Sequence, residues 1–181
     1  KEINKLYKSI RLDFKWIIYC DVDEFIVTKK NINHTIRYEL STIFKDADCI
    51  KVPWVMMSSN NNKHNPKSIL IGNIYRWNHN KKHFNKINKF RCRYDEIEIK
   101  SIFKPEKFNI INDHHPNNPI GKCIIKDSIK NQNQKLNPFY KNLREIDIKD
   151  GIFLCYHFRI ISQENSINKI KNNIWYKKNN Y

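Results

Sequence analysis

The sequence predicts an α/β fold in which a mixed sheet is flanked by helices. Segments with helical periodicity alternate with apolar, β-prone runs in the first half of the chain, whereas short apolar runs dominate the second half. A chain built only from βαβ repeats would keep alternating to its end, so a mixed sheet is favoured. No internal repeat and no obvious linker interrupts the 181 residues, which we therefore expect to form one domain, or the larger part of one.

Two helices and two strands are predicted before residue 58. Both helices show apolar side chains at helical spacing, and Asn33 or Thr35 can cap the second one. Pro53 interrupts the second strand and favours an edge, a bulge or a strand start there, because proline has no backbone N–H. In chain order, the elements are a helix over 2–14, a strand over 16–20, a helix with Ile36, Leu40, Ile43 and Phe44 on its buried stripe, and a strand over 49–57.

The second half of the chain predicts short strands and one more helix. The helix begins at Ser162 and carries Ile167, Ile170 and Ile174 on one face. Residues 127–144 are polar and weakly periodic, so we expect them to form an exposed excursion. From residue 58 onward, the other ranges are a polar loop at 58–67, a run at 69–77 that suits either helix or strand, a basic stretch at 78–89, and strands at 97–103, 108–111, 122–126 and 152–160.

An acidic motif, Asp21-Val22-Asp23-Glu24, directly follows the apolar run at 16–20. Carboxylates at the end of a buried strand are costly unless a positive charge joins them. A divalent cation is the simplest partner, because Asp21 and Asp23 are hard oxygen ligands whose i, i+2 spacing lets both reach one ion. The motif therefore predicts a metal-linked active site, and the alternative is a solvated acidic turn.

The net charge of +16, taken alone, is typical of proteins that bind nucleic acid or another anionic surface. However, Ile, Asn and Lys account for 83 of the 181 residues, and Lys outnumbers Arg by 27 to 7. AT-rich coding favours this composition, whereas recognition of phosphates and bases usually favours arginine. We attribute most of the charge to composition and the rest to attraction for a phosphorylated substrate or an acidic partner, and we expect no nucleic-acid partner.

The cysteines and the absence of targeting signals bear on the compartment. The five cysteines are odd in number and form no Cys-x-x-Cys pair, so neither a zinc knuckle nor a disulfide scaffold is expected. The sequence contains no signal peptide and no apolar run long enough to span a membrane. A cytoplasmic location is therefore favoured for the chain as given, with four cysteines acting as small hydrophobes within apolar runs: Cys20, Cys49, Cys123 and Cys155.

Two histidines and two cations outside the motif suit a site that binds a phosphorylated ligand. His114 follows the predicted strand at 108–111 and His157 precedes the last helix, so either could supply a third ligand to an ion held by two carboxylates. Arg76 and Lys100 flank strands and could meet a phosphate. The alternatives are a hydrogen-bonded structural role for each histidine and a solvated surface charge for each cation. With only three glycines, the chain cannot form a glycine-rich phosphate loop.

The pattern Trp-x-x-x-x-Asp-x-Asp-Glu-Phe at residues 16–25 resembles the metal-binding signature of GT-A glycosyltransferases. It is most similar to glycosyltransferase family 92 and a related group in family 2. Four further segments resemble segments of that group, and they occur in the same order. They are Val52-Pro53-Trp54 followed by Ser58 and Ser59, the strand at 100–105, residues 111–114, and His157-Phe158 followed by Ser162, Glu164 and Lys169.

The resemblance implies a GT-A-like fold, here a truncated Rossmann-like domain, and transfer of a sugar from a nucleotide-sugar donor to a hydroxyl of a glycan, protein or lipid acceptor. It implies that the donor diphosphate binds Mn²⁺ or Mg²⁺, which acts as a Lewis acid on the leaving group. Asp23 would ligate the metal, Asp21 would ligate it or contact the ribose side, and His157 or His114 would complete the metal site. Substrate contacts would come from Asp21, Trp54, Ser58, Ser59, Arg76 and Lys100.

The related groups mostly invert the anomeric centre, so the resemblance implies a single displacement assisted by a carboxylate base. The carboxylates left as candidates for that base are Asp95, Glu96, Glu98 and Asp113, of which Asp113 and Glu96 are selected.

The sequence departs from the family pattern in two respects. GT-A enzymes usually have a nucleotide-binding βαβ half before the acidic motif, but here only about fifteen residues precede it, so the chain is expected to correspond to the C-terminal portion of such a domain. Where the group has Glu-Arg after the Pro-Trp segment, a gapless match places Gly72-Asn73. A degenerate transferase that acts as a binding module is therefore the main alternative. A dehalogenase-type phosphatase and a basic nucleic-acid-binding protein are the other two.

Overall fold

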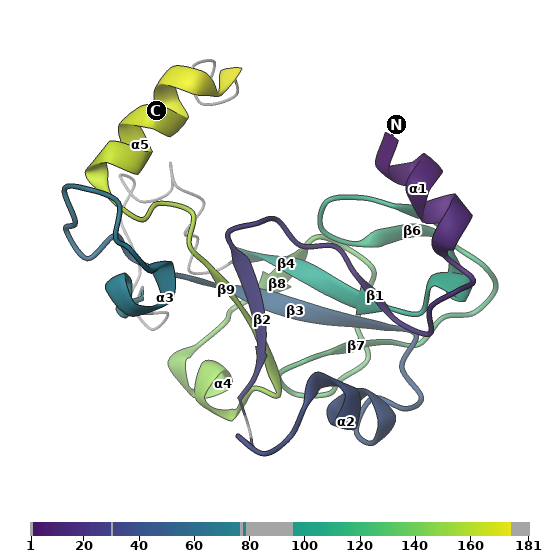
Figure 1. The fold of residues 1–181 in the computed structure, drawn as a ribbon. Helices are drawn as coiled ribbons and strands as arrows, with labels where there is room; N and C mark the ends of the chain where they lie inside the picture. The colour runs from purple at the N-terminus through teal and green to yellow at the C-terminus, as the bar shows by residue number, and fades with distance from the viewer. Residues whose placement is uncertain (1, 30, 77, 79–95, 175–181) are drawn as a thin grey trace.

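The computed structural model describes a mixed, seven-stranded sheet with helices around it and a separate two-stranded ribbon (Figure 1). The predicted α/β class with a mixed sheet is confirmed. The strand order is β1-β4-β3-β9-β2, with β7 also paired to β3 and β8 also paired to β4. The described residues are 2–29, 31–76, 78 and 96–174, so most of the predicted basic stretch at 78–89 lies outside them.

The strands and helices have the following bounds. The strands are β1 (Ile17–Ile18), β2 (Glu24–Thr28), β3 (Cys49–Met56), β4 (Glu96–Phe103), β5 (Phe108–Ile111), β6 (Pro116–Pro119), β7 (Ile125–Asp127), β8 (Phe139–Lys141) and β9 (Phe153–His157). The helices are α1 (Glu2–Ile10), α2 (Ile36–Ser41), α3 (Ile69–Gly72), the 3-10 helix η2 (Pro105–Lys107), α4 (Glu145–Asp150) and α5 (Gln163–Asn172).

Strand β3 is the centre of the sheet and is buried along its whole length. It pairs antiparallel with β4, parallel with β7 at residues 49–51 and parallel with β9 at residues 54–56. The prediction that Pro53 marks an edge, a bulge or a strand start is therefore wrong. Ile99, which is opposite Pro53, donates its N–H to Pro138 on its other side, so the Pro53 nitrogen faces the gap between β7 and β9, where no donor is needed.

Two apolar clusters form the core. The larger one joins β3, β4 and β9 to α2 and α4, and in it Phe44 stacks on Phe153 with 5.2 Å between ring centroids. The smaller one lies under α1, where the buried Tyr7 hydroxyl lies within hydrogen-bond distance of the carbonyl oxygens of Phe108 (2.8 Å) and Pro105 (3.0 Å), which share its one proton. Tyr7 thus anchors α1 beside β5, which confirms the predicted amphipathic helix, although it ends at Ile10 rather than residue 14.

The predicted cap at Thr35 and the predicted helix start at Ser162 are both confirmed. The Thr35 hydroxyl accepts from the Tyr38 N–H before α2, and the Ser162 hydroxyl accepts from the Asn165 N–H before α5. The predicted strands that correspond to β3, β4 and β5 are confirmed, and their ends lie within one residue of the predicted ends. The predicted strand at 152–160 is confirmed as β9, but it ends early, at residue 157.

Two expectations about burial and extent are wrong. The predicted strand at 16–20 is reduced to Ile17–Ile18, and the longer strand here, β2, begins at Glu24, the last residue of the acidic motif. The supposed excursion at 127–144 contains β8 and several buried side chains, because β8 pairs with β4. Of the run at 69–77, for which either helix or strand was expected, residues 69–72 form the short helix α3, and none of these four residues is buried.

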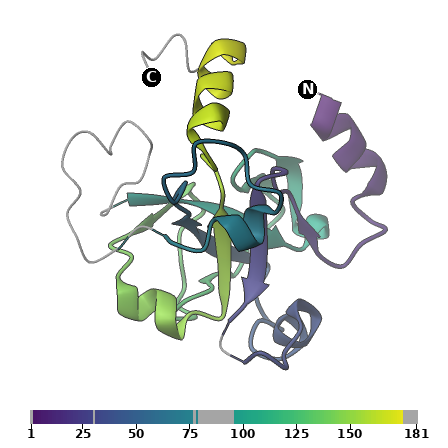
Figure 2. The ribbon, with the colours of Figure 1, turned by 60° about the vertical axis from the view of Figure 1, so that its left-hand side comes forward.

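Helix α5 is attached to the rest of the described chain through its first turn and through Lys169, whose ammonium donates to Asp23 and to the Arg159 carbonyl oxygen. Its first two N–H groups donate to the carbonyl oxygens of Asn62 and Lys63, and none of its residues is buried. Figures 1 and 2 show α5 and α1 rising from the same side of the sheet as separate helices. The four described cysteines are free thiols, and two of them, Cys49 and Cys155, are buried as small apolar side chains.

Candidate active site

The acidic motif lies on a segment that crosses the sheet. Strands β1 and β2 are at opposite ends of the strand order, so residues 19–23 must pass over β4, β3 and β9 to connect them. The Glu24 N–H donates to Asp21 O (3.1 Å), and the Phe158 N–H donates to Asp23 O (2.9 Å), which fixes this acidic turn to the end of β9. Side chains from three strands distant in sequence can therefore meet one short turn.

Lys100 of β4 joins the first carboxylate to its surroundings. Its ammonium nitrogen lies 3.1 Å from Asp21 Oδ2, 3.1 Å from Glu24 Oε2 and 2.7 Å from Asp113 O, and its side chain is fully buried. Burial lowers the pKa of Lys100, but the adjacent carboxylates of Glu24 and Asp21 outweigh burial, so its pKa is raised above the ordinary value. Lys100 is therefore a charged, buried link between the acidic turn and the segment after β5.

Asp23 lies between a lysine and a histidine. Asp23 Oδ2 accepts from the Lys169 ammonium of α5 at 3.0 Å, and Asp23 Oδ1 lies 3.6 Å from His157 Nε2. Burial alone raises the pKa of Asp23, but the His157 imidazole and the Lys169 ammonium more than offset it and hold that pKa well below the usual range for a carboxyl. Asp23 is therefore ionised at neutral pH.

Three aromatic side chains form a row beneath the acidic turn. The Trp54 ring centroid lies 4.2 Å from that of His157 and 5.3 Å from that of His114. His114 Nδ1 donates to Ile99 O (3.0 Å), which leaves Nε2 as the acceptor in the neutral ring. Trp54 Nε1 and His157 Nδ1 are buried and have no hydrogen-bond partner among the described residues.

Two lysines of the chain supply positive charge at the acidic turn. The carboxylates are neutralised by Lys100 and Lys169, so the protein itself supplies the positive charge that the sequence predicted for a metal. No group of three or more His, Cys, Asp or Glu side chains placed to hold a metal occurs within the part of the chain that the structure describes. Any metal at this turn would need further ligands from a substrate.

The sequence matches the family model of glycosyltransferase family 92 over residues 8–180. The chain belongs to glycosyltransferase family 92. Family 92 membership makes it a glycosyltransferase by class, and the mixed sheet flanked by helices is consistent with a GT-A-like fold. No curated protein matches the sequence. Across the described residues, no helix has the length and apolar character needed to cross a bilayer.

Seven of the predicted site residues gather around the acidic turn in this family 92 structure, although their roles stay predictions. They are Asp21, Asp23, Trp54, Lys100, Asp113, His114 and His157. Ser58 and Ser59 begin the loop after β3, and the Met57 N–H donates to His157 O, so this loop starts beside the turn.

Two predicted residues lie elsewhere. The Arg76 guanidinium makes two hydrogen bonds to the Glu145 carboxylate of α4, at 2.8 and 2.6 Å, and this carboxylate raises its pKa. Glu96 begins β4 opposite Lys141 of β8 and is four residues from Lys100, which corresponds to about 13 Å along a strand. Between Asp113 and Glu96, Asp113 is the one beside the acidic turn, because its backbone oxygen accepts from Lys100.

Glu24 and Lys169 have larger parts in the site than the sequence indicated. Glu24 was noted as the third acid of the motif, but its burial against Lys100 depends on a contact between β2 and β4 that no local pattern reveals. Lys169 was singled out only through the family resemblance, and its partner Asp23 is 146 positions away.

The departure from family 92 at Gly72-Asn73 has a structural counterpart. A Cβ atom on Gly72 would lie 2.4 Å from the Pro66 Cβ, so a glutamate there would require Pro66 to move. The buried Asn73 amide nitrogen donates to the carbonyl oxygens of Ser58 and Ile161. Asn73 thus ties the loop after β3 to the segment that enters α5.

Proposed function

We propose that this family 92 chain transfers a sugar from a nucleotide-sugar donor to an acceptor hydroxyl, with the donor diphosphate bound at Asp23, His157 and Lys169. The observation that carries the proposal is the position of the ionised Asp23 between a lysine and a histidine. The Lys169 side chain is 29 % exposed, so its ammonium can contact a diphosphate, unlike the fully buried ammonium of Lys100. The site thus combines an anionic metal ligand with a cation for phosphate.

The residues present fit a divalent cation that is shared with the substrate. Magnesium in nucleotide sites is usually bound by one or two carboxylates, with substrate phosphates and waters as its other ligands. The 3.6 Å between Asp23 Oδ1 and His157 Nε2 is a span that one cation can bridge. Asp23 and His157 would hold Mn²⁺ or Mg²⁺, with Asp21, whose side chain is 55 % exposed, as a further candidate ligand. The metal would supply Lewis-acid stabilisation of the departing diphosphate.

The chain's own residues would supply orientation and proton transfer. Lys169 would stabilise negative charge on the leaving nucleoside diphosphate, and the row of Trp54 and His157 would form the floor of the donor site. An acceptor oxygen would attack the anomeric carbon from the side opposite the diphosphate, which inverts that centre. Asp113 is the candidate that would accept the proton of the acceptor hydroxyl.

Thermal unfolding in the presence of nucleotides tests the donor site. UDP or GDP with Mn²⁺, at about 100 times its Kd, should add about 2.7 kcal/mol and raise Tm by roughly 5–10 °C. Asp23→Asn should abolish that shift. Asp46→Asn is the matched control, because Asp46 also pairs with a lysine, Lys126 at 2.7 Å, but lies outside the site.

The result also separates the enzyme from its main alternative. If no nucleotide raises Tm in the wild-type protein, this chain alone does not bind a donor. If a nucleotide binds at Asp23 but no panel of nucleotide sugars is hydrolysed or transferred, the chain is a degenerate transferase that acts as a binding module.

A further inference from the structure

An exposed apolar patch lies on α3 and the residues just after it, at the end of the molecule away from α1 (Figure 1). Four large apolar residues fall within the six positions 70–75, and each is more than half exposed. Single exposed apolar residues are common on protein surfaces, but a cluster of them indicates a surface that another molecule covers. The patch consists of Leu70 (57 % exposed), Ile71 (79 %), Ile74 (63 %) and Tyr75 (66 %).

The backbone of the patch is held by the loop after β3. The Gly72 carbonyl oxygen accepts from the Asn60 amide at 2.9 Å, and the Tyr75 carbonyl oxygen accepts from the Ser58 N–H at 2.9 Å. Asn73, in the middle of the patch, is fully buried. The fold therefore fixes this segment by its backbone and by Asn73, and it leaves the apolar side chains at the surface.

The patch belongs to a strongly basic part of the sequence. Residues 49–94 contain ten lysines and arginines and no Asp or Glu, so these 46 residues carry +10 of the formal charge of +16. A drift in composition toward lysine acts on the whole chain, and it does not explain why none of the chain's 18 acidic residues falls in this stretch. The local charge is thus a feature of this region, and it favours an anionic partner.

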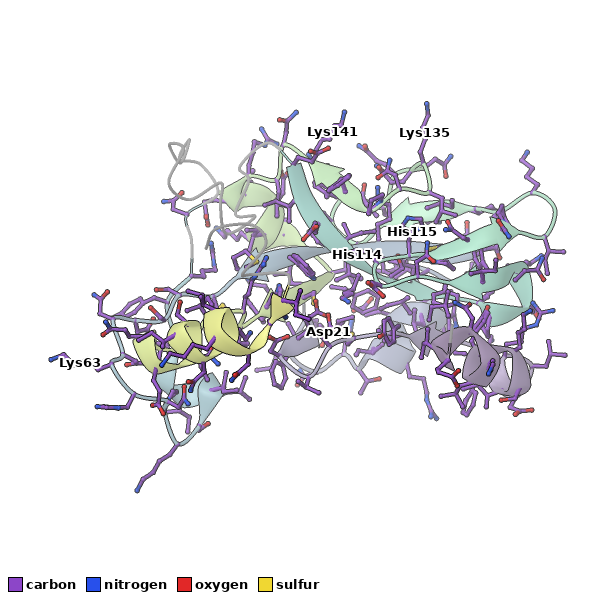
Figure 3. All side chains as sticks on the ribbon, turned by 90° about the horizontal axis from the view of Figure 1, so that it is seen from above. Asp21, Lys63, His114, His115, Lys135 and Lys141 are labelled. Carbon is purple, nitrogen blue, oxygen red and sulfur yellow. The ribbon has the colours of Figure 1, made fainter. Side chains whose placement is uncertain are left out.

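Two of these lysines flank the patch on the surface. Lys63 and Lys67 are both exposed, and Lys67 is three residues before Leu70. Figure 3 shows Lys63 pointing outward at one end of the molecule, whereas Lys135 and Lys141 lie along a different edge. The patch therefore combines apolar side chains with cations that are free to reach a partner.

One carboxylate reaches the same loop. Glu164 of α5 accepts from the Asn65 N–H at 3.1 Å and lies 3.6 Å from His64 Nδ1. Its partners are groups of the loop itself, so it reduces the positive charge beside the patch without reversing it.

We infer that this patch docks the protein on an anionic membrane surface. Leucine and isoleucine side chains can enter the boundary between headgroups and acyl chains, tyrosine favours the level of the headgroups, and lysines are attracted to anionic lipids. Nucleic acid would also attract the lysines, but its phosphate surface offers no apolar phase for Leu70 and Ile71. The inference goes beyond the proposed function and does not depend on it, and a peripheral contact needs no helix that spans the bilayer.

Sedimentation of the full chain with lipid vesicles tests the inference. The protein should bind vesicles of phosphatidylcholine with about 30 % phosphatidylserine at least roughly tenfold more tightly than vesicles of phosphatidylcholine alone. The measurement is made at about 0.1 M salt, where the Debye length of about 10 Å still lets lysines beside the patch act on the lipid surface.

Substitution of the apolar side chains separates insertion from adsorption by charge. The double variant Leu70→Ser/Ile71→Ser should bind the mixed vesicles roughly tenfold or more weakly, because two aliphatic side chains no longer leave water. Ile32→Ser is the matched control, because Ile32 is 95 % exposed in the loop before α2, and it should leave binding unchanged. Both variants should unfold at the Tm of the wild type, since the replaced side chains are exposed.

Substitution of the lysines tests the charge in the same way. Lys63→Gln/Lys67→Gln should weaken binding to the mixed vesicles roughly tenfold or more. Lys135→Gln/Lys141→Gln removes the same charge from exposed positions on another edge, and it should weaken binding by no more than about threefold.

Three results would overturn the inference. In the first, the wild-type protein binds neither kind of vesicle. In the second, Leu70→Ser/Ile71→Ser binds the mixed vesicles as tightly as the wild type, so that the protein adsorbs by charge alone. In the third, ultracentrifugation shows a dimer that this double variant abolishes and that does not bind vesicles, so that the patch joins two copies of the chain. The rise in Tm with nucleotide tests the donor site separately from all three.

Discussion

Two lysines neutralise the same acidic turn in different ways. Lys100 is fully buried and has three oxygen partners, one of them from the buried Glu24. Lys169 is part exposed and belongs to α5, a helix with no buried residue. A buried, multiply bonded cation is part of the fold, whereas a part-exposed one on a loosely packed helix can exchange its partner for a ligand. We therefore predict a structural role for Lys100 and, under the proposed function, a substrate role for Lys169.

The largest expected effect is on folding, at Lys100. Lys100→Met leaves Glu24 buried without its cation, and losing one partner of a buried ion pair typically costs about 3–5 kcal/mol. Unfolding in urea, followed by circular dichroism, measures the loss. Lys126→Met is the control, because its partner Asp46 is exposed, and it should cost about 0–1 kcal/mol. If the two variants lost the same free energy of unfolding, the structural role predicted for Lys100 would be wrong.

The next effect is on ligand binding, at Lys169. Lys169→Met should cost no more than about 1 kcal/mol of folding stability, because the pair with Asp23 is part exposed. It should weaken binding of nucleoside diphosphate with Mn²⁺ by roughly tenfold or more, since a hydrogen bond to a charged group is worth about 1.5–3 kcal/mol. Calorimetric titration measures the affinity. An unchanged affinity for the nucleoside diphosphate would show that Lys169 neutralises Asp23 but does not bind the ligand.

Features that depend on neighbours in sequence could be predicted, whereas features that depend on strand pairing could not. The caps at Thr35 and Ser162 were predictable, because a hydroxyl and the N–H three residues later are neighbours in sequence. Pro53 was misjudged, because its lack of an N–H matters only in relation to β7 and β9. The excursion at 127–144 was misjudged for a similar reason, since its buried residues depend on pairing with β4.

The site was predictable in its chemistry but not in its charge balance. The motif and the ordered family resemblance selected Asp21, Asp23, Lys100 and His157, which the structure brings close to one turn. The pairing of Asp23 with Lys169 depends on the route of residues 19–23 across three strands, and strand order cannot be deduced from periodicity. The positive charge was therefore assigned to a metal when two lysines also provide it.

A smaller effect is expected at the start of α5. The Ser162 hydroxyl caps the helix and donates to Asn65 Oδ1 at 2.7 Å, and Ser162→Ala should cost about 1 kcal/mol of helix stability. Since α5 depends on its first turn for its position, fraying should displace Lys169 and weaken nucleotide binding by less than Lys169→Met does. The same titration measures this. Ser41→Ala, at the exposed end of α2, is the control, and a larger effect from it would argue against the coupling.

The smallest expected effect is in the pH dependence of the folding stability, and it differs between Asp23 and Lys100. The pKa of Asp23 is depressed, so its contribution to stability is present above the unfolded value of about 3.9 and is lost as the pH falls through the folded pKa. The pKa of Lys100 is raised, so its contribution is fully present below the unfolded value of about 10.4 and is lost as the pH rises through the folded pKa. Both contributions should therefore be constant between about pH 5 and 9.

Urea unfolding of the wild type, Asp23→Asn and Lys100→Met across pH measures both contributions. The difference between wild type and Asp23→Asn should shrink only below about pH 4, and the difference between wild type and Lys100→Met should shrink only above about pH 10. A difference between wild type and Asp23→Asn that already shrinks well above pH 4 would contradict the depressed pKa of Asp23.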